Sequence, residues 1–225
     1  MTKDAIAGAL VLLLLAADGY ASFFVAPTEA TMGPIQRIFY LHVGSAWTGL
    51  TCFLICFIAN LLYVFRRQPR WDWLGVACAE VGLAFTTVVL VTGPIWAHPV
   101  WGIWWTWDAR LTSTFVLWLL YVSYLLLRTL IEEPDRRALF SALFGIFAFL
   151  DVPLVFGAIR WWRTQHPQPV IMGGPGSGLQ PTMRWVLLFS WVALLGLMTL
   201  LLRYRYRLEA MRGELQMVER EVEGA

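Results

Sequence analysis

The sequence predicts an all-α integral membrane protein with six transmembrane helices and a short, tryptophan-rich interfacial helix on the outer face. Of the 225 residues, 59% are hydrophobic and only 14% are charged, whereas a soluble domain usually carries about 25% charged residues. The apolar residues gather in long blocks, and a helix needs about 20 of them to cross the hydrocarbon core. Because the blocks are continuous and do not alternate with period two, they favour helices over a β-barrel.

Six blocks have the required length, at residues 5–26, 42–64, 73–95, 112–130, 139–159 and 184–202. They fill nearly the whole chain, so residues 1–203 are expected to form one transmembrane domain and residues 204–225 a cytoplasmic helical tail. The first block could instead be a signal peptide. Its length and the charge pattern favour a first transmembrane helix.

The orientation follows from the positive residues between the blocks. Most of the 17 lysines and arginines precede the first block or follow the second, fourth and sixth. Cytoplasmic loops carry an excess of such residues, so both termini are expected in the cytoplasm. Six helices then leave three segments on the outer face, at about residues 27–41, 96–111 and 160–183. The chemically unusual residues lie on or beside these segments.

The second outer segment is unusually rich in tryptophan. Five tryptophans fall between residues 96 and 107, and enrichment of tryptophan at membrane interfaces does not account for so many beside an acid and an arginine. Residues 101, 104, 105 and 108 follow the spacing of one helical face, and Pro99 suits a helix start. Residues 100–109 are therefore predicted to form a short surface helix, whose flat indole rings suit a large flat ligand.

Histidine and arginine sharpen this interpretation. All three histidines, His42, His98 and His166, are expected on the outer face, and imidazole is a common axial ligand of haem iron. His98 is the weaker candidate because it precedes Pro99 in the loop, and any single interfacial histidine could instead be a solvated or capping residue. The five outer basic residues are all arginine, which binds carboxylates through a bidentate fork. Arg37 and Arg110 are the first candidates for such a carboxylate contact, although arginines also lie at helix ends for ordinary reasons.

The residues resemble a known family. The run Trp101-Gly-Ile-Trp104-Trp105-Thr-Trp107-Asp108 looks like the WWD signature of haem-handling proteins in cytochrome c maturation. Its continuation, Asp-Ala-Arg-Leu-Thr-Ser, is similar to the CcmC family, called haem exporter protein C. The resemblance extends to Arg37-x-x-x-Tyr-x-His42 and to Trp161-Trp162-x-Thr-x-His166.

The resemblance implies a function and a site. A CcmC protein binds haem b at the periplasmic face of the bacterial inner membrane through two axial histidines, which correspond here to His42 and His166. The other haem-binding residues it implies are Trp101, Trp104, Trp105, Trp107, Asp108, Arg37 and Arg110. It delivers haem to the chaperone CcmE and works beside the ABC transporter subunits CcmA and CcmB and the small membrane protein CcmD. It is not itself an enzyme, since ATP hydrolysis belongs to a partner, and no nucleic acid is expected to bind.

Two other functions stay open at this point. The chain could be the permease subunit of an ABC-type haem exporter, but its spans are sparse in polar residues. It could also be a direct cytochrome c haem synthase of the CcsA type, although those proteins resemble this chain less closely in the residues after Asp108.

Three further features have no assigned role in haem binding. Asp151 is expected deep in the membrane, with a role in helix–helix hydrogen bonding. Residues 167–181 are rich in glycine and could be a gate or a linker. In the tail, apolar residues recur at alternating intervals of three and four positions over two heptads, which is the spacing of a coiled-coil seam. The tail is expected either to rest on the inner membrane surface or to contact a cytoplasmic partner. The seam consists of Leu208, Met211, Leu215, Val218 and Val222.

Overall fold

A computed structural model describes residues 3–167, 169, 171 and 178–223 of the chain. The elements are α1 (Lys3–Tyr20), the π-helix η1 (Ala21–Val25), the 3-10 helix η2 (Pro34–Arg37), α2 (Ile38–Arg66), α3 (Pro69–Trp101), α4 (Ala109–Leu130), α5 (Pro134–Phe149), α6 (Asp151–Trp161) and α7 (Pro181–Glu223). Six helical segments of the described chain are long and apolar enough to cross a membrane, which confirms the prediction of six spans. The fifth consists of α5 and α6 together.

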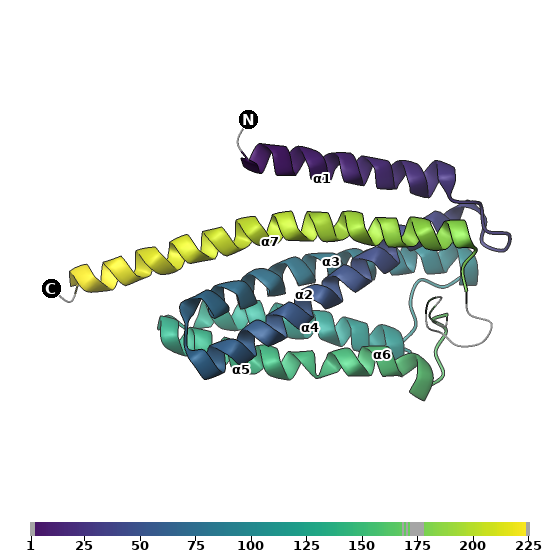
Figure 1. The fold of residues 1–225 in the computed structure, drawn as a ribbon. Helices are drawn as coiled ribbons and strands as arrows, with labels where there is room; N and C mark the ends of the chain where they lie inside the picture. The colour runs from purple at the N-terminus through teal and green to yellow at the C-terminus, as the bar shows by residue number, and fades with distance from the viewer. Residues whose placement is uncertain (1–2, 168, 170, 172–177, 224–225) are drawn as a thin grey trace.

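Local sequence explains where the helices begin and end. Asp108 and Glu133 cap α4 and α5, because each side chain accepts hydrogen bonds from two free backbone N–H groups of the first turn. The break between α5 and α6 at Leu150 lies three residues before Pro153. Proline has no N–H to donate to the carbonyl four residues earlier, so the helix is interrupted without a change of direction (Figure 1).

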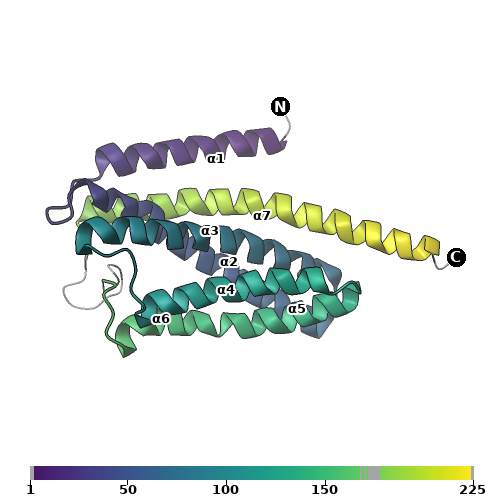
Figure 2. The same cartoon turned by 180° about the vertical axis from the view of Figure 1, so that it is seen from behind.

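The helices form an up-and-down bundle around the hairpin of α2 and α3 (Figures 1 and 2). At its centre Phe53 of α2 stacks on Tyr121 of α4, with ring centroids 3.7 Å apart. In contrast, α1 has no buried residue and packs chiefly against α7. Burial of apolar area therefore holds α2 to α6 together, while α1 depends on its contact with α7.

Ion pairs and hydrogen bonds join the helices where polar side chains occur. Asp72 and Arg128 link α3 to α4 through two hydrogen bonds of 2.5 and 2.8 Å between nearly buried side chains. Ser190 of α7 donates a hydrogen bond to Asp18 of α1. Such contacts compensate polar groups that would be costly in lipid.

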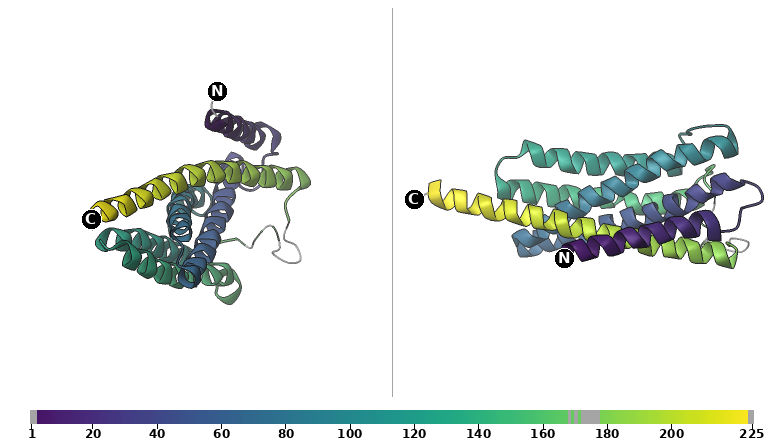
Figure 3. Two further views of the ribbon diagram at one scale, coloured as in Figure 1. Left: turned by 60° about the vertical axis from the view of Figure 1, so that its left-hand side comes forward. Right: turned by 90° about the horizontal axis from the view of Figure 1, so that it is seen from above.

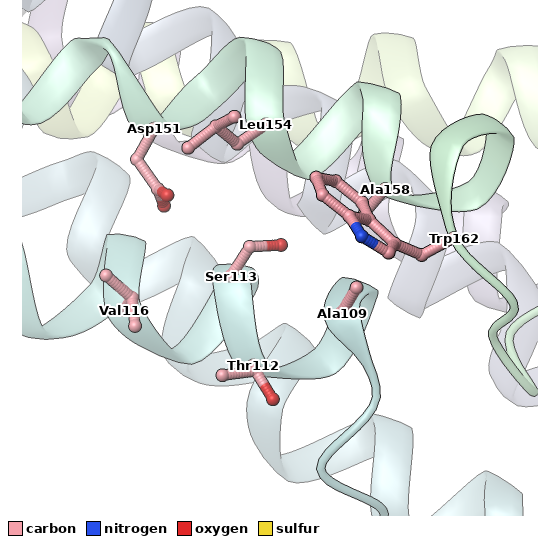
Figure 4. A pocket seen from close by; sticks show the side chains of 8 residues that line it. All are labelled: Ala109, Thr112, Ser113, Val116, Asp151, Leu154, Ala158 and Trp162. Atoms are coloured by element: carbon pink, nitrogen blue, oxygen red, sulfur yellow. The ribbon is translucent and has the colours of Figure 1, made fainter.

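Asp151 differs from these residues. The residue is 8% exposed, and its Oδ2 has no hydrogen-bond partner among the described residues. The carboxylate faces a groove of about 250 Å³ between α4 and α6 that Ser113 also lines (Figure 4). Among the described residues, Oδ2 of Asp151 therefore lacks the helix–helix hydrogen bond that was expected.

The bundle has two distinct ends. The segments that follow α1, α3 and α6 lie together at one end, which we call the histidine end (Figure 1). Lys3 and the last turns of α7 lie toward the opposite end, which we call the terminal end. This arrangement brings the three predicted outer segments to one side of the bundle.

Candidate functional site

His42 lies in the second turn of α2 and is 8% exposed. Its Nδ1 is 2.8 Å from Oγ1 of Thr92 on α3. The Thr92 hydroxyl donates its proton to the Val88 carbonyl at 2.7 Å, so toward His42 it can only accept. Nδ1 of His42 therefore carries the proton, and Nε2 has the free lone pair that a metal ion needs.

The surroundings of His42 hold the ring in place. The Trp96 indole meets the imidazole edge to face at 5.7 Å, and Phe39 packs on the same indole at 5.9 Å. A Cβ atom at Gly93 would lie 3.4 Å from Cε1 of His42, which leaves little room for a larger residue. Helix α3 thus positions His42 through a hydrogen bond, an aromatic contact and a close backbone approach.

His166 lies in the segment after α6 and is half-buried. Its Nδ1 is 2.9 Å from the Pro167 carbonyl, and a carbonyl can only accept, so Nδ1 is again the protonated nitrogen. Burial and then the positive charge of Arg110 lower the pKa of His166 below its ordinary 6.5. The ring is therefore neutral at pH 7, with the lone pair on Nε2.

The two histidines lie near each other at the histidine end. His42 lies within electrostatic range of both His166 and Arg110, and His166 lies within range of Arg110. Helix α2 and the segment after α6 therefore place two imidazoles with the same tautomer within electrostatic range of each other, 124 positions apart in the sequence. This juxtaposition agrees with the expectation that both lie on one face of the protein.

Asp108 connects the second and third segments of the histidine end. Its Oδ1 accepts from the N–H groups of Arg110 and Leu111 at 2.9 and 3.0 Å. Its Oδ2 accepts from the Gln165 N–H at 3.4 Å, and the carboxylate is also hydrogen bonded by the side chain of Thr164. Because the His166 N–H donates to Thr164 Oγ1 at 3.1 Å, Asp108 is two hydrogen bonds away from His166.

These hydrogen bonds decide the charge of Asp108. Burial alone would raise the pKa of its carboxyl, but the hydrogen bonds from Leu111, Thr164, Thr106 and Gln165 outweigh burial and hold that pKa below 3.8. Hydrogen bonds to the ionised form stabilise it. Asp108 is therefore a carboxylate at neutral pH, used as a cap and as a tether.

The short helix predicted over residues 100–109 is wrong. Helix α3 continues through Pro94 and Pro99 as far as Trp101 and ends at Gly102, whose φ of 73° suits a residue without a side chain. Because Asp108 already caps α4, residues 102–108 connect two helices and contain no α-helical residue. The helical face that was expected to hold residues 101, 104, 105 and 108 does not exist.

The tryptophans form two groups in place of one continuous aromatic face. Trp104 stacks on His98 with ring centroids 4.2 Å apart and planes at 17°. Trp105 and Trp107 meet edge to face at 5.6 Å, and both contact Phe115 of α4. Trp107 is 73% exposed, so the second group keeps an accessible aromatic surface at the histidine end.

The two candidate arginines differ in what they contact. Arg110 donates a hydrogen bond from NH1 to the Val155 carbonyl of α6, and its guanidinium lies 6.0 Å from the Phe156 ring. Arg37 makes a hydrogen bond of 3.4 Å to Thr28, and its Nε has no partner among the described residues. Among the described residues, each arginine is thus held through one side-chain hydrogen bond, and the Nε of Arg37 is buried.

Sequence reasoning missed several contributors to this site. Thr92, Trp96 and Thr164 hold the two histidines, and Phe115 supports two of the tryptophans. Two of them were visible in the sequence: Trp96 as one of the five clustered tryptophans, and Thr164 as part of the motif that ends at His166. The glycine-rich stretch predicted as a gate or linker lies largely outside the described residues.

Comparisons with known proteins agree on one family. The family model described as Heme exporter protein C matches residues 3–221. A Heme exporter protein C of Bradyrhizobium diazoefficiens is 33% identical over 93% of this chain and 77% of its own length. The protein of that name from Paracoccus denitrificans is 30% identical over 85% of this chain and 80% of its own length. A Marchantia polymorpha mitochondrial protein, named as ccmC-like in cytochrome c biosynthesis, is 31% identical over 73% of this chain and 69% of its own length.

Proposed function

Because this chain belongs to the CcmC family, heme exporter protein C, we propose that it binds haem b at its histidine end and delivers it to the chaperone CcmE. The family takes part in cytochrome c biogenesis. In this proposal the histidine end faces the periplasm of a bacterial inner membrane, and both termini lie in the cytoplasm. The excess of lysine and arginine at the terminal end supports that orientation.

The observation that carries the proposal is the shared tautomer of His42 and His166. Each donates its Nδ1 proton to a fixed acceptor, the Thr92 hydroxyl or the Pro167 carbonyl. Metal-ligating histidines usually donate their second ring N–H to such an acceptor. The two Nε2 lone pairs would thus be suited to hold a haem iron, for which imidazole is a common ligand.

The remaining donor set also fits haem. The charged guanidinium of Arg37 would suit a propionate, and the indoles offer flat apolar surface for a porphyrin. In this proposal Arg110 contributes mainly through its charge, because NH1 is engaged by Val155, while Asp108 positions His166. Trp101, Trp104 and Trp107 are 45%, 58% and 73% exposed. Such exposure suits a site that presents its cargo for transfer better than one that retains it.

The partners follow from the family and from what this chain lacks. The sequence contains no Cys-x-x-Cys-His motif, so covalent attachment of haem to this chain is not expected. In this proposal the chain acts without catalysing a reaction, beside CcmA, CcmB and CcmD, and ATP hydrolysis by CcmA drives release of loaded CcmE. Copurification of haem-loaded CcmE with this chain tests the delivery step, and its absence would contradict that step.

Two alternative functions make different demands. A permease subunit of an ABC-type exporter should move haem into vesicles, whereas the delivery subunit should not. A direct synthase of the CcsA type should attach haem to a Cys-x-x-Cys-His peptide without CcmE. A vesicle transport assay and a peptide modification assay therefore test these two alternatives, and both assays are expected to be negative.

A further inference from the structure

Helix α7 extends well beyond a membrane span. Its 43 residues are unbroken from Pro181 to Glu223, which at 1.5 Å per residue is about 64 Å, about twice the thickness of a hydrocarbon core. The apolar stretch ends at Arg203, so about 20 residues remain on the terminal side. Figures 1 and 3 show this part continuing in the direction of the bundle and extending past the other helices.

One face of this extension packs on the bundle. Half-buried residues recur along it at positions 202, 205, 206, 209, 210, 213 and 216, which is the spacing of one helical face. A Cβ atom at Gly213 would lie 2.6 Å from Nε1 of Trp73, so α7 crosses the start of α3 at close range. Arg137 at the start of α5 donates a hydrogen bond of 2.9 Å to Gln216. These contacts fix the rotation of α7 about its axis.

The opposite face is apolar and exposed. We call it the tail seam, and its residues are Leu208 (42% exposed), Met211 (57%), Leu215 (59%), Val218 (55%) and Val222 (72%). At 100° per residue these positions centre roughly 170° from the bundle-facing residues. The more hydrophobic face of the extension is therefore turned away from the protein, and exposed apolar surface of this extent marks an interaction site.

A membrane surface does not account for the tail seam. A helix lying on the membrane must turn through a large angle where it leaves the hydrocarbon core. The helix α7 has no such bend, because its hydrogen bonding is helical from Pro181 to Glu223. The interpretation of the tail as a surface-lying helix thus disagrees with the fold, and the tail seam extends into water.

The flanking charges argue against pairing with a second copy of this chain. In the heptad defined by the seam, Arg207 and Arg212 flank the first turns, while Glu214 and Glu219 flank the next. Two copies in one membrane point the same way, so a parallel pair would place arginine against arginine and glutamate against glutamate. The ion pairs of Arg207 with Asp4 and of Arg212 with Glu209 offset only the first of these repulsions. Such like-charge pairs oppose association. The pattern instead complements a different helix with the reverse order of charges.

We propose that the tail seam binds a helix of another protein, which carries apolar residues at heptad spacing. That helix has acidic side chains opposite Arg207 and Arg212 and basic side chains opposite Glu214 and Glu219. The salt bridge of 2.8 Å between Arg207 and Asp4 of α1 holds this arginine beside the seam. The proposal does not depend on haem binding, because the seam lies at the end of the bundle opposite the histidines.

Thiol accessibility tests this surface directly. A cysteine at Leu215→Cys lies in the seam, and Met217→Cys provides a matched control, because Met217 is exposed on the same helix but lies outside the seam. The three natural cysteines are buried. Labelling by a water-soluble maleimide is measured in nanodiscs that contain only this chain and in the membranes of its own cell.

We expect Leu215→Cys to react rapidly in nanodiscs and about tenfold more slowly in native membranes, as for a surface covered nine-tenths of the time. Met217→Cys should react rapidly in both. Adding Glu214→Lys and Glu219→Lys should restore rapid labelling in native membranes without altering the rate in nanodiscs. Slow labelling in nanodiscs would mean that lipid or a second copy covers the seam. Equal rates in the two preparations, or no response to charge reversal, would also overturn the proposal.

Discussion

The substitution Asp108→Asn separates the two tasks of Asp108. Asparagine caps helices about as well as aspartate does, so its amide oxygen can still accept from the Arg110 and Leu111 N–H groups. The amide nitrogen, however, cannot accept from Gln165 and Thr164, which hold the segment of His166. The substitution therefore removes the tether to His166 and keeps the cap of α4.

The expected magnitude follows from these contacts. Hydrogen bonds to a charged group contribute about 1.5–3 kcal/mol, and the 3.4 Å distance from Gln165 N to Asp108 favours the lower limit. About 1.4 kcal/mol corresponds to a tenfold change in affinity. Asp108→Asn should thus weaken haem binding about tenfold with little change in Tm. Asp108→Ala should weaken binding and also lower Tm by about 2–4 °C, because the loss of a cap costs about 1 kcal/mol.

The assay is haem titration of the purified chain, followed through its absorbance, together with thermal unfolding in the same detergent. Glu133→Ala is the matched control, because it removes the cap of α5 at the terminal end and should lower Tm without changing haem affinity. Wild-type affinity in Asp108→Asn would refute the tether. Equal losses of Tm in the asparagine and alanine variants would refute the separation of the two tasks.

Three further predictions concern other parts of the structure. Thr92→Val should lower haem affinity about 10- to 100-fold, as for loss of a residue that orients a metal ligand, and Thr92→Ser should recover most of it, as measured by the same titration. Because the pKa of His166 lies below 6.5, its imidazole stays neutral above that pH. Haem affinity should therefore be constant from pH 8 to 6.5 and fall at lower pH as the ring takes up a proton. A haem affinity that rises on acidification would contradict this prediction. Asp72→Asn should lower the free energy of unfolding by about 3–5 kcal/mol by leaving the Arg128 charge unpaired, whereas Asp72→Leu with Arg128→Met should recover much of the loss in denaturant titrations.

The sequence predicted the membrane-spanning part well for a physical reason. In lipid every backbone polar group must be satisfied within the segment, so a long apolar block has little choice but to be a helix. The placement of His42 and His166 at one end followed from the order of the spans, because the chain crosses the membrane an even number of times between these two residues. Neither inference required knowledge of side-chain packing.

The prediction failed where it rested on helical periodicity and on Pro99 as a helix start, because Pro99 lies inside α3. Four residues with helical spacing cannot distinguish a helix from a connecting segment, and Gly102 and Asp108 are a helix stop and a helix cap. Reading those two residues first would have excluded the short helix. The pairing of Thr92 with His42 could not be predicted, because it depends on how α3 is rotated against α2.

The central claim is that His42 and His166 hold one haem iron between them. The most direct test is the absorption and magnetic circular dichroism spectrum of the chain purified from haem-replete cells. We predict a low-spin, bis-histidine signal that is lost in His42→Ala and in His166→Ala. The signal should persist in His98→Ala, because His98 stacks on Trp104 and has no part in ligation. Persistence of the bis-histidine signal in both His42→Ala and His166→Ala would contradict the claim.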